Sequence, residues 1–145
     1  MLPHNVASVN LVVCEKLLSE EDNVVSAIRI ADVFLAPVES DIAIERQAIK
    51  ISVFGQIKMT DTDQAEHTLE LRLVRPNGEY EVAGPPTSGP AKTVFPEFPG
   101  GYIIVGQIRV VPTQHGLHAF SLLMDGEEIT RCPFILIKQA PEKAL

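Results

Sequence analysis

Two histidines and two acidic residues lie close together in the second half of the chain, in a pattern that could hold a metal ion. His115 and His118 flank a Gly-Leu pair, and Asp125 and Glu127 follow soon after. Imidazole nitrogens and carboxylate oxygens are common ligands of zinc and other transition metals. However, His118 falls in a predicted strand and is expected to point outward, and His115 falls in the turn before it. The pattern therefore favours a solvated pair, with a metal, small-molecule or hydrolytic site as the alternative.

A nucleophilic Ser or Cys would need a base within hydrogen-bond reach and usually a strained, Gly-framed turn. Ser121 falls inside a predicted strand and Ser88 in a loop. Cys14 and Cys132 lie in apolar, strand-like segments, where a free thiol normally behaves as a small buried hydrophobe. We therefore expect reduced core cysteines, no catalytic residue and no cofactor, although the sequence leaves the question of an enzyme open.

The segment Gly84–Gly101 differs in composition from the rest of the chain. It holds five of the eleven prolines, and it includes Phe95-Pro96-Glu97-Phe98-Pro99. A connection this long is uncommon in a small domain and is usually functional or mobile. Its two phenylalanines must either pack onto the domain or await a partner. As the candidate site of partner binding we therefore take Phe95, Phe98, Pro96 and Pro99.

Short strands must position these residues, because Val and Ile dominate and several segments alternate apolar with polar residues. No segment has sustained helical periodicity, and Val38–Arg46 is at most a single turn or a loop. Two turn signals, Asn77-Gly78 and Asp125-Gly126, predict hairpins. We predict an all-β, two-sheet antiparallel sandwich of about eight strands, at Ala7–Lys16, Asn23–Leu35, Ala48–Lys58, His67–Arg75, Tyr80–Val82, Tyr102–Val111, Leu117–Asp125 and Glu127–Lys138.

Pro133 lies in the last predicted strand and has no N–H for the sheet ladder. It should therefore face an open edge or occupy a bulge, and that edge is a possible pairing surface. We expect one domain over residues 1–145, with flexible tails at 1–6 and 139–145.

Composition narrows the class of partner. A formal net charge of −7 and the absence of a Lys/Arg cluster argue against nucleic acid. The wholly apolar stretches are too short to cross a bilayer as helices, so we expect a soluble protein with no membrane partner. The start of the chain has no signal-peptide pattern, which favours the cytoplasm.

The pattern of several segments resembles a bacterial family of small immunoglobulin-like β-sandwich proteins, a domain-of-unknown-function family. The resemblance rests on Asn10–Lys16, Asn23–Ile30, Leu69–Gly78 and above all Gly116–Phe134. Members often have Asp-Gly at the first hairpin, where this chain has Asp22-Asn23. The resemblance implies an immunoglobulin-like fold, and it implies no activity, cofactor or site residue.

These observations favour a non-enzymatic module that binds another protein, or a second copy of itself, through a sheet edge or the Gly84–Gly101 loop.

Overall fold

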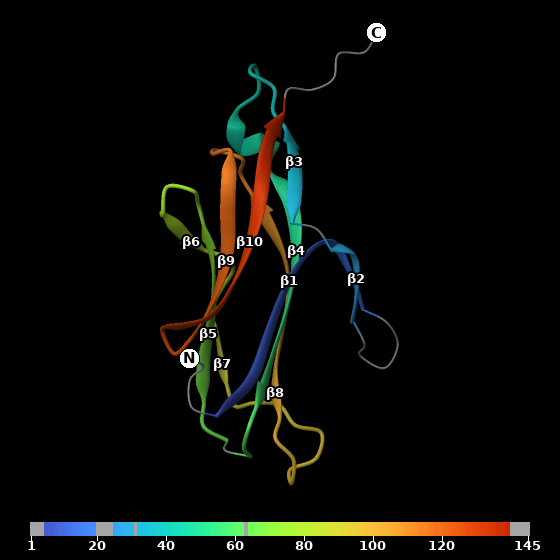
Figure 1. Ribbon diagram of the computed structural model, residues 1–145, viewed down its shortest axis with the longest axis vertical. Coiled ribbons are helices and arrows are strands. Elements are labelled where there is room, and N and C mark those ends of the chain that lie inside the picture. The colour runs from blue at the N-terminus through green and yellow to red at the C-terminus, as the bar shows by residue number, and fades with distance from the viewer. Residues whose placement is uncertain (1–4, 20–24, 31, 63, 140–145) are drawn as a thin grey trace.

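The computed structural model describes residues 5–19, 25–30, 32–62 and 64–139, and within them the chain is all-β (Figure 1). Besides its strands, this part of the chain has a short 3-10 helix, Ile44–Gln47. The strands are β1 (Val6–Ser19), β2 (Val25–Ile30), β3 (Val33–Pro37), β4 (Ile49–Met59), β5 (His67–Val74), β6 (Tyr80–Val82), β7 (Thr87–Gly89), β8 (Gly101–Val110), β9 (Gly116–Met124) and β10 (Glu127–Gln139).

The strands form two sheets that pack face to face. Sheet A has the order β2-β1-β4-β8, and sheet B has the order β3-β10-β9-β5-β6, with β7 also paired to β5. Apart from the parallel pair β3 and β10, the pairings are antiparallel. Figure 1 shows the two layers side by side, with the Gly84–Gly101 loop at one end and the 3-10 helix at the other.

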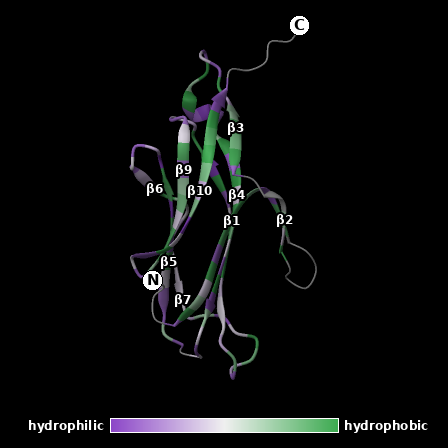
Figure 2. Ribbon diagram, viewed as in Figure 1, coloured by the Kyte–Doolittle hydropathy of each residue, from purple (hydrophilic) through white to green (hydrophobic). Residues whose placement is uncertain are grey.

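Alternate residues of both sheets meet in one core. Val13, Val53 and Ile57 come from sheet A, and Phe120 and Phe134 come from sheet B. Phe120 stacks on Phe134 with ring centroids 5.2 Å apart. Figure 2 shows hydrophobic residues along much of β3 and β10. Burial of these apolar side chains is the main force that holds the sheets together.

The structure has ten strands in the described residues, not about eight. The predicted strand Asn23–Leu35 is two strands, because the chain leaves sheet A after β2 and joins sheet B as β3. The backbone carbonyl of Asp32, at this crossing, accepts the N–H of Ile135 at 2.7 Å. The second addition is β7, which lies inside the predicted long loop.

Pro133 was predicted at an open edge or a bulge, and it lies in an interior strand, on a stretch of β10 that no described residue of β3 pairs with. The N–H of Ile135 points toward β3, and strand alternation turns the nitrogen of Pro133 to the same side. Pairing with β3 starts only at Ile135, so no ladder bond of that pairing is lost. However, β10 is not an edge strand, because β3 covers it from Ile135 to Gln139. The edge strands of sheet A are β2 and β8.

The predicted tails fall mostly outside the described residues, at 1–4 and 140–145. The described parts belong to the fold: Val6 is buried in β1, and Asn5 accepts the N–H of Thr60 at 2.8 Å. The predicted turn at Asp22-Asn23 also lies outside the described residues.

Candidate functional site

The Gly84–Gly101 segment is fixed at its base. β7 pairs with the first half of β5, and the hydroxyl of Tyr102 donates to the carbonyl of Gly89 at 2.9 Å. Lys92 and Gly101 form an antiparallel bridge in which each N–H donates to the other's carbonyl, both at 2.9 Å. The segment is therefore an anchored arm that ends in a closed loop.

The Gly-Gly pair at the end of this loop is required by close backbone approach. A Cβ at Gly100 would lie 2.2 Å from the carbonyl oxygen of Lys92, and one at Gly101 would lie 2.2 Å from that of Ile57. Both obstacles are backbone, which cannot swing aside as a side chain can. The two glycines therefore let three backbone segments meet at the neck of the loop.

The tip of the loop presents both candidate phenylalanines to solvent. Phe95 is 58% exposed and Phe98 is 60% exposed, and their rings meet edge to face at 6.3 Å. The hydroxyl of Thr93 donates to the carbonyls of Phe95 and Phe98, at 2.6 and 3.1 Å, and so holds the turn between them. Pro96 and Pro99 are exposed beside the rings. The phenylalanines thus do not pack onto the domain.

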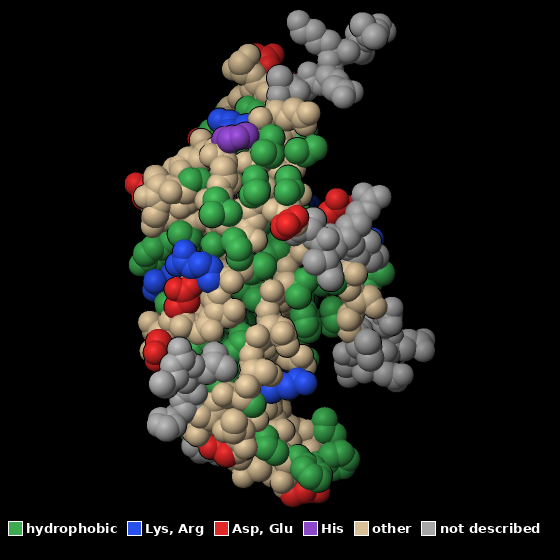
Figure 3. Space-filling view, viewed as in Figure 1, with side chains coloured by type: hydrophobic (Ala, Val, Ile, Leu, Met, Phe, Trp, Pro, Cys, Tyr) green, Lys and Arg blue, Asp and Glu red, His purple; other side chains and the backbone are tan. Residues whose placement is uncertain are grey.

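A hollow of about 1220 Å³ lies between this loop and the ends of the sheets. Figure 3 shows the lower end of the molecule projecting beside the hollow, with hydrophobic side chains gathered at its tip. Backbone and polar groups line it as well as apolar ones, among them Gln56, Lys58, Ser88, Val94, Pro99 and Ile103.

The outer face of β8 continues the apolar surface. Ile103 is 60% exposed and Val105 is 52% exposed, and Val105 is the cross-strand neighbour of the half-buried Phe54. The sequence did not identify these two residues, because Tyr102–Val105 is apolar throughout and gives no alternation to separate the faces.

A second exposed apolar cluster lies on the outer face of sheet B. Leu117 pairs with Ile135, which pairs with Val33 of β3, and Leu35 follows two residues later on the same face. All four side chains are exposed. Figure 3 shows hydrophobic side chains over this part of β3 and β10.

The structure separates the two histidines of the suggested metal site. His118 is only 1% exposed and stacks on Phe134 at 5.4 Å, so the prediction that it points outward is wrong. Burial lowers its pKa and the charge of Arg75 lowers it further, against a hydrogen bond from its Nδ1 to Gly116. His115 is exposed, and its Nδ1 accepts the N–H of Lys138 at 3.1 Å. His118 follows the inward parity of Phe120, which strand alternation alone could have indicated.

The described part of the chain has no group of three or more His, Cys, Asp or Glu side chains placed to hold a metal ion. Cys14 is buried and Cys132 is half-buried, and both are free thiols, as expected. Burial raises the pKa of both thiols, which keeps them protonated and poorly nucleophilic. Ser121 is buried and donates to the carboxylate of Glu128.

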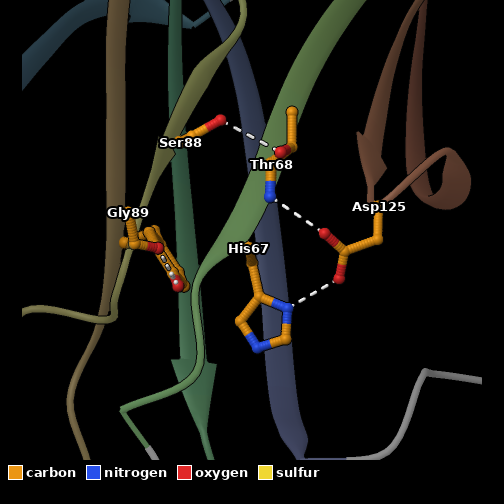
Figure 4. A network of polar contacts seen from close by, with 6 residues as sticks. His67, Thr68, Ser88, Gly89 and Asp125 are labelled. Atoms are coloured by element: carbon orange, nitrogen blue, oxygen red, sulfur yellow. Dashed lines mark hydrogen bonds and ion pairs between the residues drawn. The ribbon is translucent and has the colours of Figure 1, made fainter.

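A polar network that the sequence did not reveal lies at the start of β5 (Figure 4). Asp125 accepts from the Nδ1 of His67 at 2.6 Å and from the N–H of Thr68 at 2.9 Å. These bonds lower the pKa of Asp125. Burial raises the pKa of Tyr102, and the negative charge of Asp125 raises it further. No local signal finds this pair, because only the pairing of β5 with β9 brings the two segments together.

An Asp-oriented histidine can serve as a general base, so the nearest hydroxyls matter. The Ser88 hydroxyl is hydrogen-bonded to the Thr68 hydroxyl at 3.0 Å and not to His67. Figure 4 shows the ring of His67 directed away from Ser88. Among the described residues, His67 is hydrogen-bonded to Asp125 and to no hydroxyl, and the network ties β5 to the β9–β10 turn.

Protein-family models and curated protein sequences give no match. Among solved structures, the chain is similar to the Pseudomonas fluorescens alkylpurine DNA glycosylase AlkC bound to DNA containing an abasic site analog. The identity is 14% and the TM-score is 0.42, over 88% of this chain and 30% of the glycosylase chain. This chain thus spans less than a third of that protein. No helix in the described residues is long and apolar enough to cross a membrane.

Proposed function

We propose that this protein is a non-enzymatic binding module that contacts another protein, or a second copy of itself, through the tip of the Gly84–Gly101 loop. The observation that carries the proposal is the pair Phe95 and Phe98, two large apolar rings held more than half exposed on an anchored arm. Aromatic side chains dominate the energetics of many protein interfaces, because they bury a large area at low entropic cost.

The anchoring supports binding more than mobility. The neck is closed by the Lys92–Gly101 bridge, and Thr93 holds the turn between the rings. A surface that is ordered before binding loses less conformational entropy in the complex. We also propose that the module is cytoplasmic. We further propose that it is an immunoglobulin-like sandwich, and the two sheets packed face to face support this assignment.

The test compares two double variants. Phe95→Ala/Phe98→Ala should leave the melting temperature within a few degrees of the wild type, since exposed rings contribute little to folding. It should remove the partner or the oligomer that native mass spectrometry detects for protein isolated from its host.

The matched control is Leu35→Ala/Leu117→Ala, which trims the exposed apolar cluster of sheet B. It should retain the partner. Loss of the partner in this control alone would move the contact to sheet B, and a large fall in melting temperature of the phenylalanine variant would mean that the rings serve the fold.

A further inference from the structure

Strand β8 is the longest edge strand among the described residues, and only its first residue, Gly101, is bridged on the outer side, by Lys92. It has 10 residues, whereas the other strands at the sheet edges, β2, β3, β6 and β7, have 6, 5, 3 and 3. Natural sheets usually protect an edge by keeping it short or by placing Pro or Lys on it. The stretch Tyr102–Ile108 contains neither, and it carries no charge.

The backbone of β8 offers a regular set of hydrogen-bonding groups on its free side. Both the N–H and the C=O of Gly101 point to that side, because both bond to Lys92. Strand alternation then turns the N–H and C=O of Ile103, Val105 and Gln107 to the same side. Within the described residues no backbone group is bonded to them there. An added strand could therefore form main-chain hydrogen bonds with these three residues.

Unpaired cations stand at both ends of this edge. Lys58 is the cross-strand neighbour of Gly101, beside Lys92, and Lys50 is the neighbour of Arg109. All four side chains are exposed, and none takes part in an ion pair with a described residue. The guanidinium of Arg109 donates instead to the backbone carbonyl of Glu45. Between these ends lie the exposed side chains of Ile103 and Val105.

We propose that β8 pairs with an extended segment of a partner protein that has β-branched apolar residues at its centre and a carboxylate at each end. Main-chain hydrogen bonds would supply the affinity, as in other cases of strand addition. The two cationic ends lie about 26 Å apart at the rise of a β-strand. Because Lys92 already bonds the outward groups of Gly101, an added segment can pair only with the stretch from Ile103 to Arg109, and its two carboxylates stand about six positions apart on one face.

The cations at the two ends of β8 favour a partner protein over a second copy of this chain. If two β8 strands paired with each other antiparallel, Arg109 and Lys50 of one copy would lie near Lys58 and Lys92 of the other. Like charges opposite one another destabilise a strand pair. The acidic partner segment avoids this repulsion. The inference rests on the proposal that the module binds protein, and it assigns the partner's chemistry at β8 next to the Phe95/Phe98 tip.

The experiment uses the full chain and the fluorescein-labelled peptide Asp-Thr-Ile-Thr-Val-Thr-Asp, with a counterpart in which both Asp are Lys. Fluorescence anisotropy should show the acidic peptide binding about tenfold or more tightly than the lysine peptide, from the exchange of attraction for repulsion at both ends. Hydrogen exchange should slow at the amides of Ile103, Val105 and Gln107 when the acidic peptide is present.

Val105→Pro removes one outward N–H and leaves the β4–β8 ladder intact, because Pro is tolerated at an edge that faces solvent. It should reduce peptide binding about tenfold or more, since one ladder bond is lost and the ring blocks approach. Val105→Thr keeps both the N–H and the β-branched shape and should bind nearly as the wild type does.

The inference is overturned if neither peptide slows exchange along β8, if both peptides bind equally, or if native mass spectrometry finds a dimer that Val105→Pro dissociates. Its failure is distinct from that of the proposed function. If Phe95→Ala/Phe98→Ala loses the host partner while no peptide binds at β8, the tip proposal stands and this one falls.

Discussion

The outer faces of the two sheets differ in whether their charged side chains form ion pairs. On sheet B, Arg72 pairs with Glu70 and Arg131 pairs with Glu128. On sheet A beside β8, Lys50 and Lys58 have no ion pair with a described residue. The first face satisfies its own charges and the second leaves them available. This contrast is what the proposed pairing of a partner with β8 rests on.

The paired face of sheet B is also more deeply buried than an outer face usually is. Ser121 lies between Arg72 and Arg131 in the sheet, and the neighbouring Leu123 lies between Glu70 and Glu128. Both are buried, whereas Ile103 on the outer face of β8 is open to solvent. Long charged side chains can cover apolar surface with their aliphatic stems while their head groups remain hydrated. Salt bridges and burial therefore coincide on this face.

The largest expected effect tests this difference in burial. Leu123→Ala should lower the free energy of unfolding by about 2–3 kcal/mol, because it opens a cavity under the charged side chains. Ile103→Ala, the matched change on sheet A, should alter it by about 0.5 kcal/mol or less. Urea unfolding at pH 7 measures both. Equal losses would mean that the two faces are buried alike.

The next effect concerns the inner side of sheet B, where Nε2 of His118 is buried without a hydrogen-bond partner among the described residues. Burial lowers the pKa of His118 in the folded protein. Protons therefore bind the unfolded state more readily, and stability should fall as pH drops below about 6.5, the ordinary pKa of histidine.

This pH dependence can be removed by substitution. Between pH 7 and pH 5 the wild type should lose stability through His118, by at most about 2 kcal/mol, and His118→Phe should lack this loss because the variant keeps a planar ring against Phe134 and has no titrating group. Urea unfolding of both proteins at the two pH values is the measurement. Identical losses in both proteins would assign the pH dependence to other groups.

A smaller effect is expected at the rim of sheet B, from Asp125→Asn. Because the Asp125 side chain is half exposed, its bonds to His67 and Thr68 should contribute less than about 1 kcal/mol at pH 7. Its pKa is lowered in the folded state, so this contribution is present above the ordinary value of 3.8 and is lost as pH falls below it. Thermal unfolding of both proteins at pH 7 and pH 3 should show the difference shrinking. A constant difference would assign it to lost packing.

The smallest expected effect is the difference in stability lost when a paired cation and an unpaired one are removed. Arg131→Met should cost about 0.5 kcal/mol, through the exposed pair with Glu128, and Lys58→Met should cost nothing measurable. High salt should weaken the first effect, since it screens exposed pairs. A larger loss from Lys58→Met would mean that the sheet A cations serve the fold.

The sequence predicts strands well where one face meets the core and the other meets water. In β5, Leu69, Leu71 and Leu73 alternate with Glu70 and Arg72, and the predicted strand matches the observed one to within a residue. The pattern fails where long apolar runs hide a change of sheet. The predicted strand Asn23–Leu35 contains the crossing at Asp32, because a Val/Ile-rich run reads alike in either sheet.

Site residues are harder to predict than strands, because exposure depends on which strand becomes a neighbour. Phe95 and Phe98 stand out by composition alone. Ile103 and Val105 are exposed because β8 ends sheet A and no described strand packs over its outer face, which no local pattern reveals. His67 and Asp125 lie in segments far apart in the chain and meet only through strand pairing.

The closed neck of the Gly84–Gly101 arm bears on how this protein could diversify. Lys92 and Gly101 fix the two ends of the segment 93–100 to the sandwich, independently of what lies between them. Residues 93–99 could be exchanged, or their number changed, while the two sheets keep their packing, whereas Gly100 must stay because a Cβ there would meet the backbone of Lys92. Related chains could in this way change what the loop contacts by varying this one loop on a constant two-sheet scaffold.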